Sequence, residues 1–165
     1  MNLVPFAKRL TSAVVAKDKS GIEAVCFDLE CTQLECEFWM QEVFDFFTYA
    51  LQDKTTCSLK GSSSLVMSLY DDFGKLTKSQ RANLLAIFDE NAEYFGDEML
   101  RHSISDMVAR KYPPVSAINL FKKWRQSNSP KLLHMARVGL EVLIMADRLD
   151  AESKKTVRTL LGLYK

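Results

Sequence analysis

The chain has 165 residues, of which 47% are hydrophobic and 26% are charged, and its formal net charge at pH 7 is +1. This composition excludes an intrinsically disordered chain and is ordinary for a globular protein. Six glycines and four prolines are few, which favours helices joined by short turns over a sandwich or barrel of many strands. We therefore expect one all-helical domain, residues 1–165.

The N-terminal part begins with an apolar stripe over Val4–Lys17 that predicts a helix. In the next segment Val25, Phe27 and Leu29 alternate with charged or thiol residues, as in a strand, but the alternation changes phase at Cys31–Thr32. We predict a long helix here, or two helices with a break near Thr32. The choice between strand and helix for residues 25–34 stays open. Further on, Gly61 and three serines make residues 57–64 the clearest predicted loop.

Local signals predict most helix ends in the remainder of the chain. They are the capping box of Thr77 and Gln80, Gly96 followed by Asp97, Pro113–Pro114, Ser129–Pro130, and Asp150. The segment Leu132–Leu149 is apolar almost all round, which predicts a central buried helix. In the last helix we expect the inward side chains to be Val157, Leu160, Leu161 and Tyr164.

A periodicity of 36 to 40 residues indicates helical hairpins in residues 62–165. Met67, Met107 and Met145 each lie in a predicted helix that a second helix follows. Leu84–Leu85, Leu120–Phe121 and Leu160–Leu161 lie in those second helices. On this spacing the chain resembles a short HEAT-like or armadillo-like helical array, and a bundle of antiparallel helices fits equally well. The predicted fold is all-α: antiparallel helical hairpins stacked as a short HEAT-like array or an irregular helical bundle, with N-terminal helices in residues 1–53.

The cysteines and the apolar stretches indicate a cytoplasmic protein. The sequence begins with a charged pair where the apolar core of a secretory signal would lie, and its longest apolar stretch is interrupted by Glu141. We therefore expect no membrane contact and free thiols in a reducing compartment. The four cysteines are Cys26, Cys31, Cys36 and Cys57. Their spacing is not that of a zinc site, and we expect small buried side chains.

Catalytic motifs do not emerge from the sequence. Asp72-Phe73-Gly74 matches a kinase tripeptide, but none of the other kinase motifs accompanies it. His102 and Asp106 lie one turn apart and are interpreted as a surface hydrogen bond, whereas His134, among apolar neighbours, is interpreted as a core histidine. We expect a protein that is not an enzyme, with no catalytic residues, no cofactor and no metal site.

Charge is distributed unevenly along the chain. Residues 21–53 contain eight acidic residues and no Lys or Arg, whereas residues 101–165 contain thirteen basic residues against five acidic ones. An uneven charge distribution of this kind affects which partners a protein binds rather than which fold it adopts. The predicted partner-binding residues form an acidic face interleaved with aromatic residues: Glu30, Glu35, Glu37, Glu42 and Asp45. The alternative is a solvated face that the C-terminal bases balance elsewhere in the fold.

In size and charge the chain resembles the immunity proteins and antitoxins with which bacteria neutralise nuclease-like toxins. The resemblance implies a basic protein partner, such as a toxin domain, whose cleft the acidic face would cover. We therefore predict a non-enzymatic protein-binding module of unknown oligomeric state. The alternative is a nucleic-acid-binding helical protein that uses basic residues around Trp124: Lys122, Lys123, Arg125 and Lys131. A sequence pI of about 7.6 is low for that function.

Overall fold

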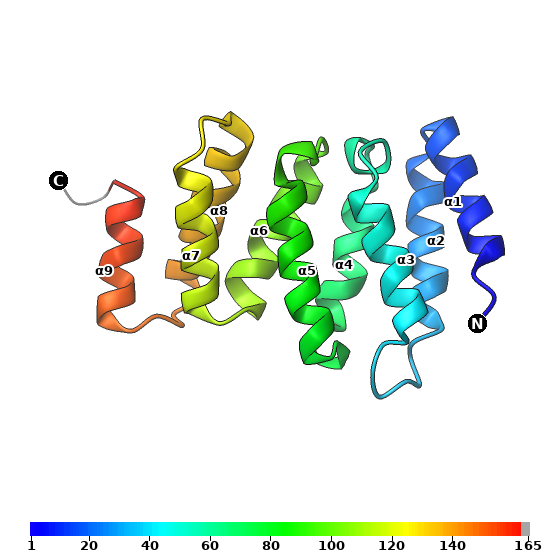
Figure 1. The fold of residues 1–165 in the computed structure, drawn as a ribbon, viewed down its shortest axis with the longest axis horizontal. Helices are drawn as coiled ribbons and strands as arrows, with labels where there is room; N and C mark the ends of the chain where they lie inside the picture. Colours follow the sequence, from blue (N-terminus) through cyan, green and yellow to red (C-terminus); the bar gives the residue numbers. More distant parts are fainter. Residues whose placement is uncertain (163–165) are drawn as a thin grey trace. The chain divides into compact units, whose positions relative to one another are not determined.

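A computed structural model describes residues 1–162, in which every regular element is a helix (Figure 1). The all-α prediction is confirmed. The α-helices are α1 (Val4–Ala16), α2 (Lys19–Cys31), α3 (Gln41–Gln52), α4 (Ser63–Asp71), α5 (Lys78–Asn91), α6 (Glu98–Lys111), α7 (Pro114–Arg125), α8 (Pro130–Met145) and α9 (Ala151–Leu160). Short 3₁₀ turns, η1 to η3, cover Thr56–Ser58, Phe73–Lys75 and Ala92–Tyr94. No helix of the described residues is long and apolar enough to cross a membrane.

The chain divides into two compact units, Met1–Arg101 and His102–Lys165. The single domain expected from the sequence, with N-terminal helices in residues 1–53 and hairpins in residues 62–165, stays a prediction. The division into two units follows the charge. The first unit contains sixteen acidic and ten basic residues, a net charge of −6, and the second contains five acidic and twelve basic residues, a net charge of +7.

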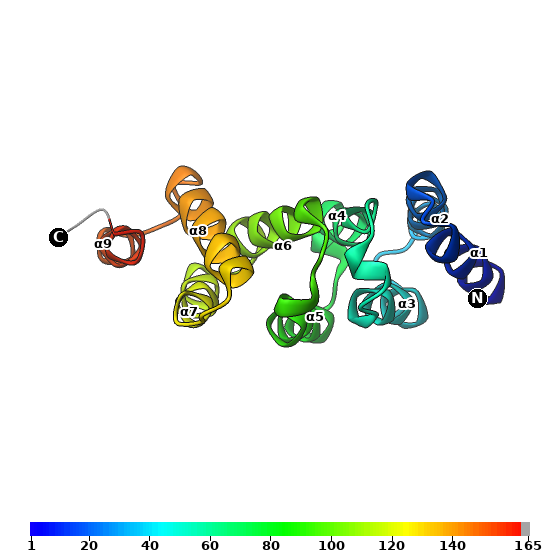
Figure 2. The ribbon, with the colours of Figure 1, turned by 90° about the horizontal axis from the view of Figure 1, so that it is seen from above.

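The N-terminal unit is built from two layers of helices. Helix α1 packs on α2, α2 packs beside α4 in one layer, and α3 packs beside α5 in the other (Figure 2). Helix α3 illustrates how the two layers pack together. Its apolar residues recur at helical spacing and face the interior of the unit. The fully buried side chains of this unit include Ile22, Leu29, Phe44, Phe47, Leu69 and Phe88.

The C-terminal unit is centred on the hairpin of α7 and α8, on which α9 packs. Gly139 of α8 lies directly against the Phe121 ring of α7, where an added Cβ would come within 2.1 Å of Cζ. The segment Leu132–Leu149 is expected to be a central buried helix, and α8 buries one face but ends earlier, at Met145. Its other face is exposed and carries His134, Arg137, Glu141 and Met145.

The helix ends agree closely with the local signals. The Thr77–Gln80 capping box is complete, and the carboxylates of Asp97 and Asp150 accept hydrogen bonds from the N–H groups of Leu100 and Ser153. Ser129 is the exception, since its side chain makes no capping bond. In the last helix Val157 is buried, as expected, while Leu160 and Leu161 are half-buried. Tyr164 lies outside the described residues.

The ambiguous segment is helical up to Cys31, so the strand alternative is wrong, and the break near Thr32 is present. The break is longer than expected, because α3 begins only at Gln41. At the predicted loop 57–64, a 3₁₀ turn overlaps the start and α4 begins at Ser63.

The three methionines that suggested a repeat lie in α4, α6 and α8, each followed by a further helix, as expected. Only Met107 is buried, whereas Met67 and Met145 are exposed. The three residues therefore do not occupy equivalent core positions, and the HEAT-like organisation stays a prediction.

Candidate protein-binding surface

The segment between α2 and α3, Thr32–Met40, is here called the acidic loop. Gln33, which is completely buried, organises it from within. Its side-chain carbonyl accepts a hydrogen bond from the N–H of Met40 at 2.9 Å, and its amide donates to the Thr32 hydroxyl at 2.7 Å. That hydroxyl donates to the carbonyl of Leu29 at 2.6 Å. The two ends of the loop are thus joined through one side chain.

Trp39 fixes the loop to the rest of the N-terminal unit. Its side chain is 3% exposed and packs edge-on against Phe47, with ring centroids 5.2 Å apart. The indole N–H donates to Oδ2 of Asp72 at 3.1 Å, and the backbone N–H donates to the carbonyl of Lys75 at 3.2 Å. The Gln80 amide donates to the Trp39 carbonyl at 3.2 Å. Satisfied buried polar contacts of this kind hold a loop in one conformation.

Lys75 also holds the acidic loop in place through its ammonium group. Its ammonium lies 3.3 Å from Asp72 and donates to the carbonyls of Gln33 and Leu34 at 3.3 and 3.4 Å. The positive charge is therefore directed at the backbone of the loop and at Asp72. It forms no ion pair with Glu35 or Glu37.

The outward side of the loop combines apolar and acidic side chains. Leu34 is 66% exposed and Phe38 is 51% exposed, and the exposed Glu35 and Glu37 lie between and beside them in the sequence. On α2, the exposed Phe27 and Cys31 are one turn apart and continue the apolar side chains toward the loop. Exposed apolar groups bordered by charge are typical of protein contact sites.

The predicted acidic residues do not lie on one helix face, which corrects the helical arrangement expected from the sequence. Glu30 is at the end of α2, Glu35 and Glu37 are in the loop, and Glu42 and Asp45 are in α3. Of the aromatic residues interleaved with these acids, Trp39 is in the core, Phe46 is half-buried and Phe38 is exposed.

Internal contacts distinguish these acids from one another. The Met1 ammonium donates to Glu42 at 2.9 Å, and this hydrogen bond lowers the pKa of the Glu42 carboxyl. Asp45 accepts a hydrogen bond from the Gln41 amide at 2.7 Å. Among the described residues, Glu30, Glu35 and Glu37 form no ion pair. Their charges are therefore the ones most open to an external partner.

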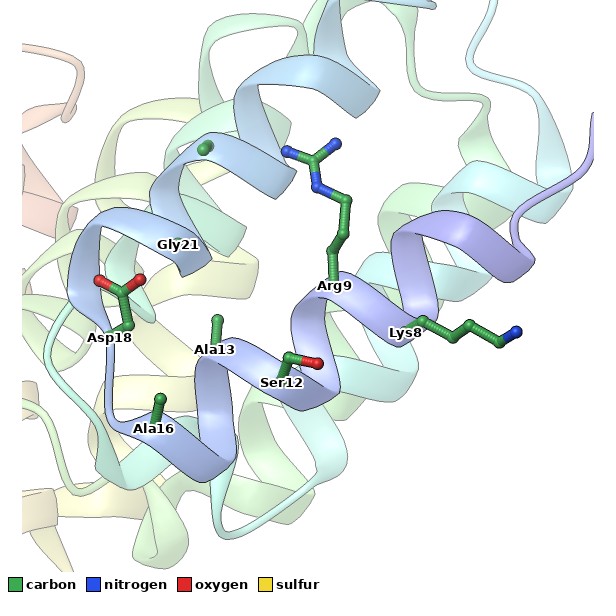
Figure 3. A pocket seen from close by; sticks show the side chains of 8 residues that line it. Lys8, Arg9, Ser12, Ala13, Ala16, Asp18 and Gly21 are labelled. Carbon is green, nitrogen blue, oxygen red and sulfur yellow. The ribbon is translucent and has the colours of Figure 1, made fainter.

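Elsewhere on α1 and α2 the charges compensate one another. Arg9 lies 2.7 Å from Asp28, and Lys19 lies 3.4 Å from Glu23. Between these helices is an open hollow of about 440 Å³ lined by Lys8, Arg9, Ser12, Ala13, Ala16, Asp18, Gly21 and Ala24 (Figure 3). Gly21 permits the close approach of the two helices, because a Cβ there would lie 2.9 Å from that of Ala13.

The basic residues of the alternative prediction lie on the surface of the C-terminal unit. Lys122, Lys123 and Arg125 occupy the last turn of α7, where cations complement the helix dipole, and Lys131 is in the first turn of α8. Trp124 is only 1% exposed and packs edge-on against Phe121. The aromatic platform that this alternative requires is therefore in the core, and the bases remain as a helix exterior.

Both histidine interpretations change. Asp106 is 2.9 Å from Nε of Arg110, and His102 instead faces His134, with their Nε2 atoms 3.3 Å apart. His134 is at the surface and is not a core residue. No sequence signal pairs these two residues, because they are 32 positions apart on different helices. The same holds for Gln33 and Trp39, whose anchoring roles the sequence does not reveal.

No family model, no curated protein and no solved structure matches the chain.

Proposed function

We propose that the protein is a binding module that engages a basic protein partner through the acidic loop and the adjoining end of α2. One observation carries the proposal: a loop held rigidly by Gln33 and Trp39 displays Leu34 and Phe38 beside the unpaired carboxylates of Glu35 and Glu37. A preorganised loop binds without the entropic cost of being ordered at the interface.

The two kinds of exposed side chain have different roles in this proposal. Leu34 and Phe38 supply the apolar anchors that dominate binding free energy. Glu35 and Glu37 accelerate encounter with a positively charged surface and disfavour acidic competitors. The net charge of −6 on the N-terminal unit extends the same field beyond the loop.

The most concrete form of the proposal is an immunity or antitoxin protein whose partner is a basic, nuclease-like toxin domain. This form is supported by the acid-rich surface and the small helical fold. An enzyme that approaches phosphates requires positive charge, which is complementary to that surface. An adaptor that binds another basic protein is the broader form of the same proposal.

The test uses three versions of the full chain as bait in co-purification from source cells at low and high salt. They are the wild type, the double variant Glu35→Lys/Glu37→Lys and the control Glu90→Lys/Glu152→Lys, which makes the same net-charge change at exposed sites outside the loop. We expect one basic protein with the wild type and the control, released as salt rises, and little of it with the loop variant.

Purified partner then allows kinetic measurement. At low salt the loop variant should associate at least tenfold more slowly than the control variant. If the partner cleaves nucleic acid, equimolar wild-type chain should inhibit it. Identical protein recovery with all three baits, or recovery of nucleic acid alone, would contradict the proposal.

A further inference from the structure

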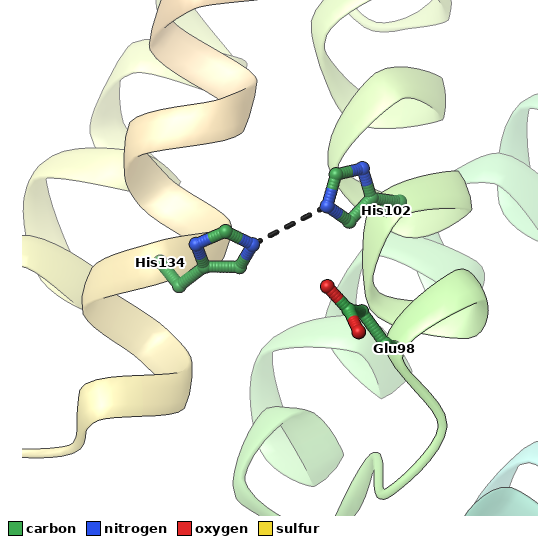
Figure 4. A group of neighbouring side chains, drawn as sticks. All are labelled: Glu98, His102 and His134. Atoms are coloured by element: carbon green, nitrogen blue, oxygen red, sulfur yellow. Dashed lines mark hydrogen bonds between the residues drawn. The ribbon is translucent and has the colours of Figure 1, made fainter.

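His102 of α6 and His134 of α8, both in the C-terminal unit, direct the same ring nitrogen at each other (Figure 4). Their Nε2 atoms are 3.3 Å apart, and the ring planes are inclined at 47° with centroids 5.3 Å apart. Both rings are at the surface, so an ion from solution can reach them. These are also the only two histidines of the sequence.

The separation of the two nitrogens fits a shared metal ion. With Zn–N distances of 2.0–2.1 Å, two nitrogens of a tetrahedral zinc site are about 3.3 Å apart. Two neutral imidazoles that form a direct hydrogen bond use only one lone pair between them, whereas an ion uses both. The helices thus already hold the rings at the spacing that metal binding requires.

The neighbouring carboxylate on α6, that of Asp106 one turn after His102, is held by Arg110. The two imidazoles of the C-terminal unit are therefore the donors on which the site rests.

We propose that His102 and His134 bind one divalent transition-metal ion, with zinc as the representative. Imidazole ligands favour zinc, copper, nickel or iron over magnesium and calcium, which prefer oxygen donors. Two protein ligands leave the remaining positions of a tetrahedral ion for solvent. The bound ion would join α6 to α8 and stabilise the C-terminal unit, independently of the acidic loop.

The test is calorimetric titration of the full chain with Zn²⁺ at neutral pH. The background is Cys31→Ser/Cys36→Ser, because these two thiols are the accessible soft ligands elsewhere in the chain. We expect one equivalent of zinc to bind. His102→Ala and His134→Ala should each weaken binding at least tenfold. Asp106→Asn, a neighbouring carboxylate change outside the ligand set, should leave the affinity unchanged.

Two further readouts distinguish binding from misfolding. Zinc should raise the thermal midpoint of the parent and of Asp106→Asn but not of His102→Gln, which keeps a polar side chain of similar size. Imidazole nitrogen resonances of the two histidines should both shift together as zinc is added. Absence of stoichiometric binding, or histidine variants that bind zinc with the affinity of the parent, would overturn the proposal.

Discussion

The indole N–H of Trp39 donates a hydrogen bond to Oδ2 of Asp72, 33 residues further along the chain and 3.1 Å away. This contact fixes the acidic loop on the N-terminal unit, because Asp72 also binds Lys75, whose ammonium holds the loop carbonyls. The stability of the unit and the shape of the proposed binding surface therefore depend on the same few atoms.

Replacement of Trp39 by Phe should destabilise the protein by about 1–3 kcal/mol, since it removes a buried hydrogen bond and leaves a cavity. Urea unfolding measures this change. The matched control is Phe38→Ala, at the adjacent exposed aromatic residue, which should alter the free energy of unfolding by less than about 0.5 kcal/mol. Equal effects of the two substitutions would show that the loop is not anchored through Trp39.

Gly139→Ala should cost about 1–3 kcal/mol or more, because the new methyl group would overlap the Phe121 ring between α7 and α8. Gly74→Ala is the control, since no atom lies within 4 Å of a Cβ added there. That control should be neutral or stabilise by up to about 1 kcal/mol through the unfolded chain. Thermal unfolding of both variants checks the packing of the hairpin, and an unaffected Gly139→Ala protein would contradict it.

The four thiols should divide into two classes in a thiol-reagent assay at pH 8. Burial raises the pKa of the Cys26 and Cys57 thiols to about 12, so that almost no thiolate exists there in the folded protein. Cys31 is exposed and Cys36 is half-exposed. We expect two thiols to react in the native protein and four in denaturant, and Cys31→Ser/Cys36→Ser to abolish the native reaction. Rapid reaction of all four native thiols would be inconsistent with this burial.

Asp53 should make stability depend on acidic pH. The Thr56 hydroxyl, 2.6 Å from Oδ2, donates to this carboxylate and lowers its pKa below the ordinary range, with a further bond from the Thr56 N–H. The unfolded chain therefore takes up the proton more readily. The stabilisation is complete above the ordinary aspartate pKa and is lost as pH falls through the lower value of the folded state.

Asp53→Asn keeps an oxygen acceptor but cannot titrate. Its free energy of unfolding, measured in urea between pH 3 and 6, should fall less steeply on acidification than that of the wild type. Asp150→Asn is a useful comparison, because the Ser153 N–H also lowers the Asp150 pKa, at a helix start in the other unit. Parallel pH profiles for the wild type and Asp53→Asn would contradict the assigned role.

The acidic loop shows which structural features the sequence pattern predicts and which it does not. Alternation over Val25–Leu29 left a strand, one long helix and two helices with a break near Thr32 open, and the structure has the break, with Gln33 closing a loop that continues to Met40. Phe38 and Trp39 are adjacent aromatic residues in the sequence, and it is the Trp39 indole that donates a hydrogen bond to Asp72. The sequence pattern therefore shows that acidic residues are concentrated here, but it does not determine the face on which each of them lies.

By itself, the sequence determined the helical class, most helix ends and the separation of charge. Those features depend on composition or on neighbours within one turn, as in the Thr77–Gln80 capping box or the Asp150 cap. Trp124 follows Phe121 by three residues, a helical spacing that places both side chains on one face, and both are buried. The tertiary structure alone decided that His134 meets His102 and that Leu34 and Phe38 are exposed. These outcomes depend on how residues distant in sequence pack, and no local spacing encodes that packing.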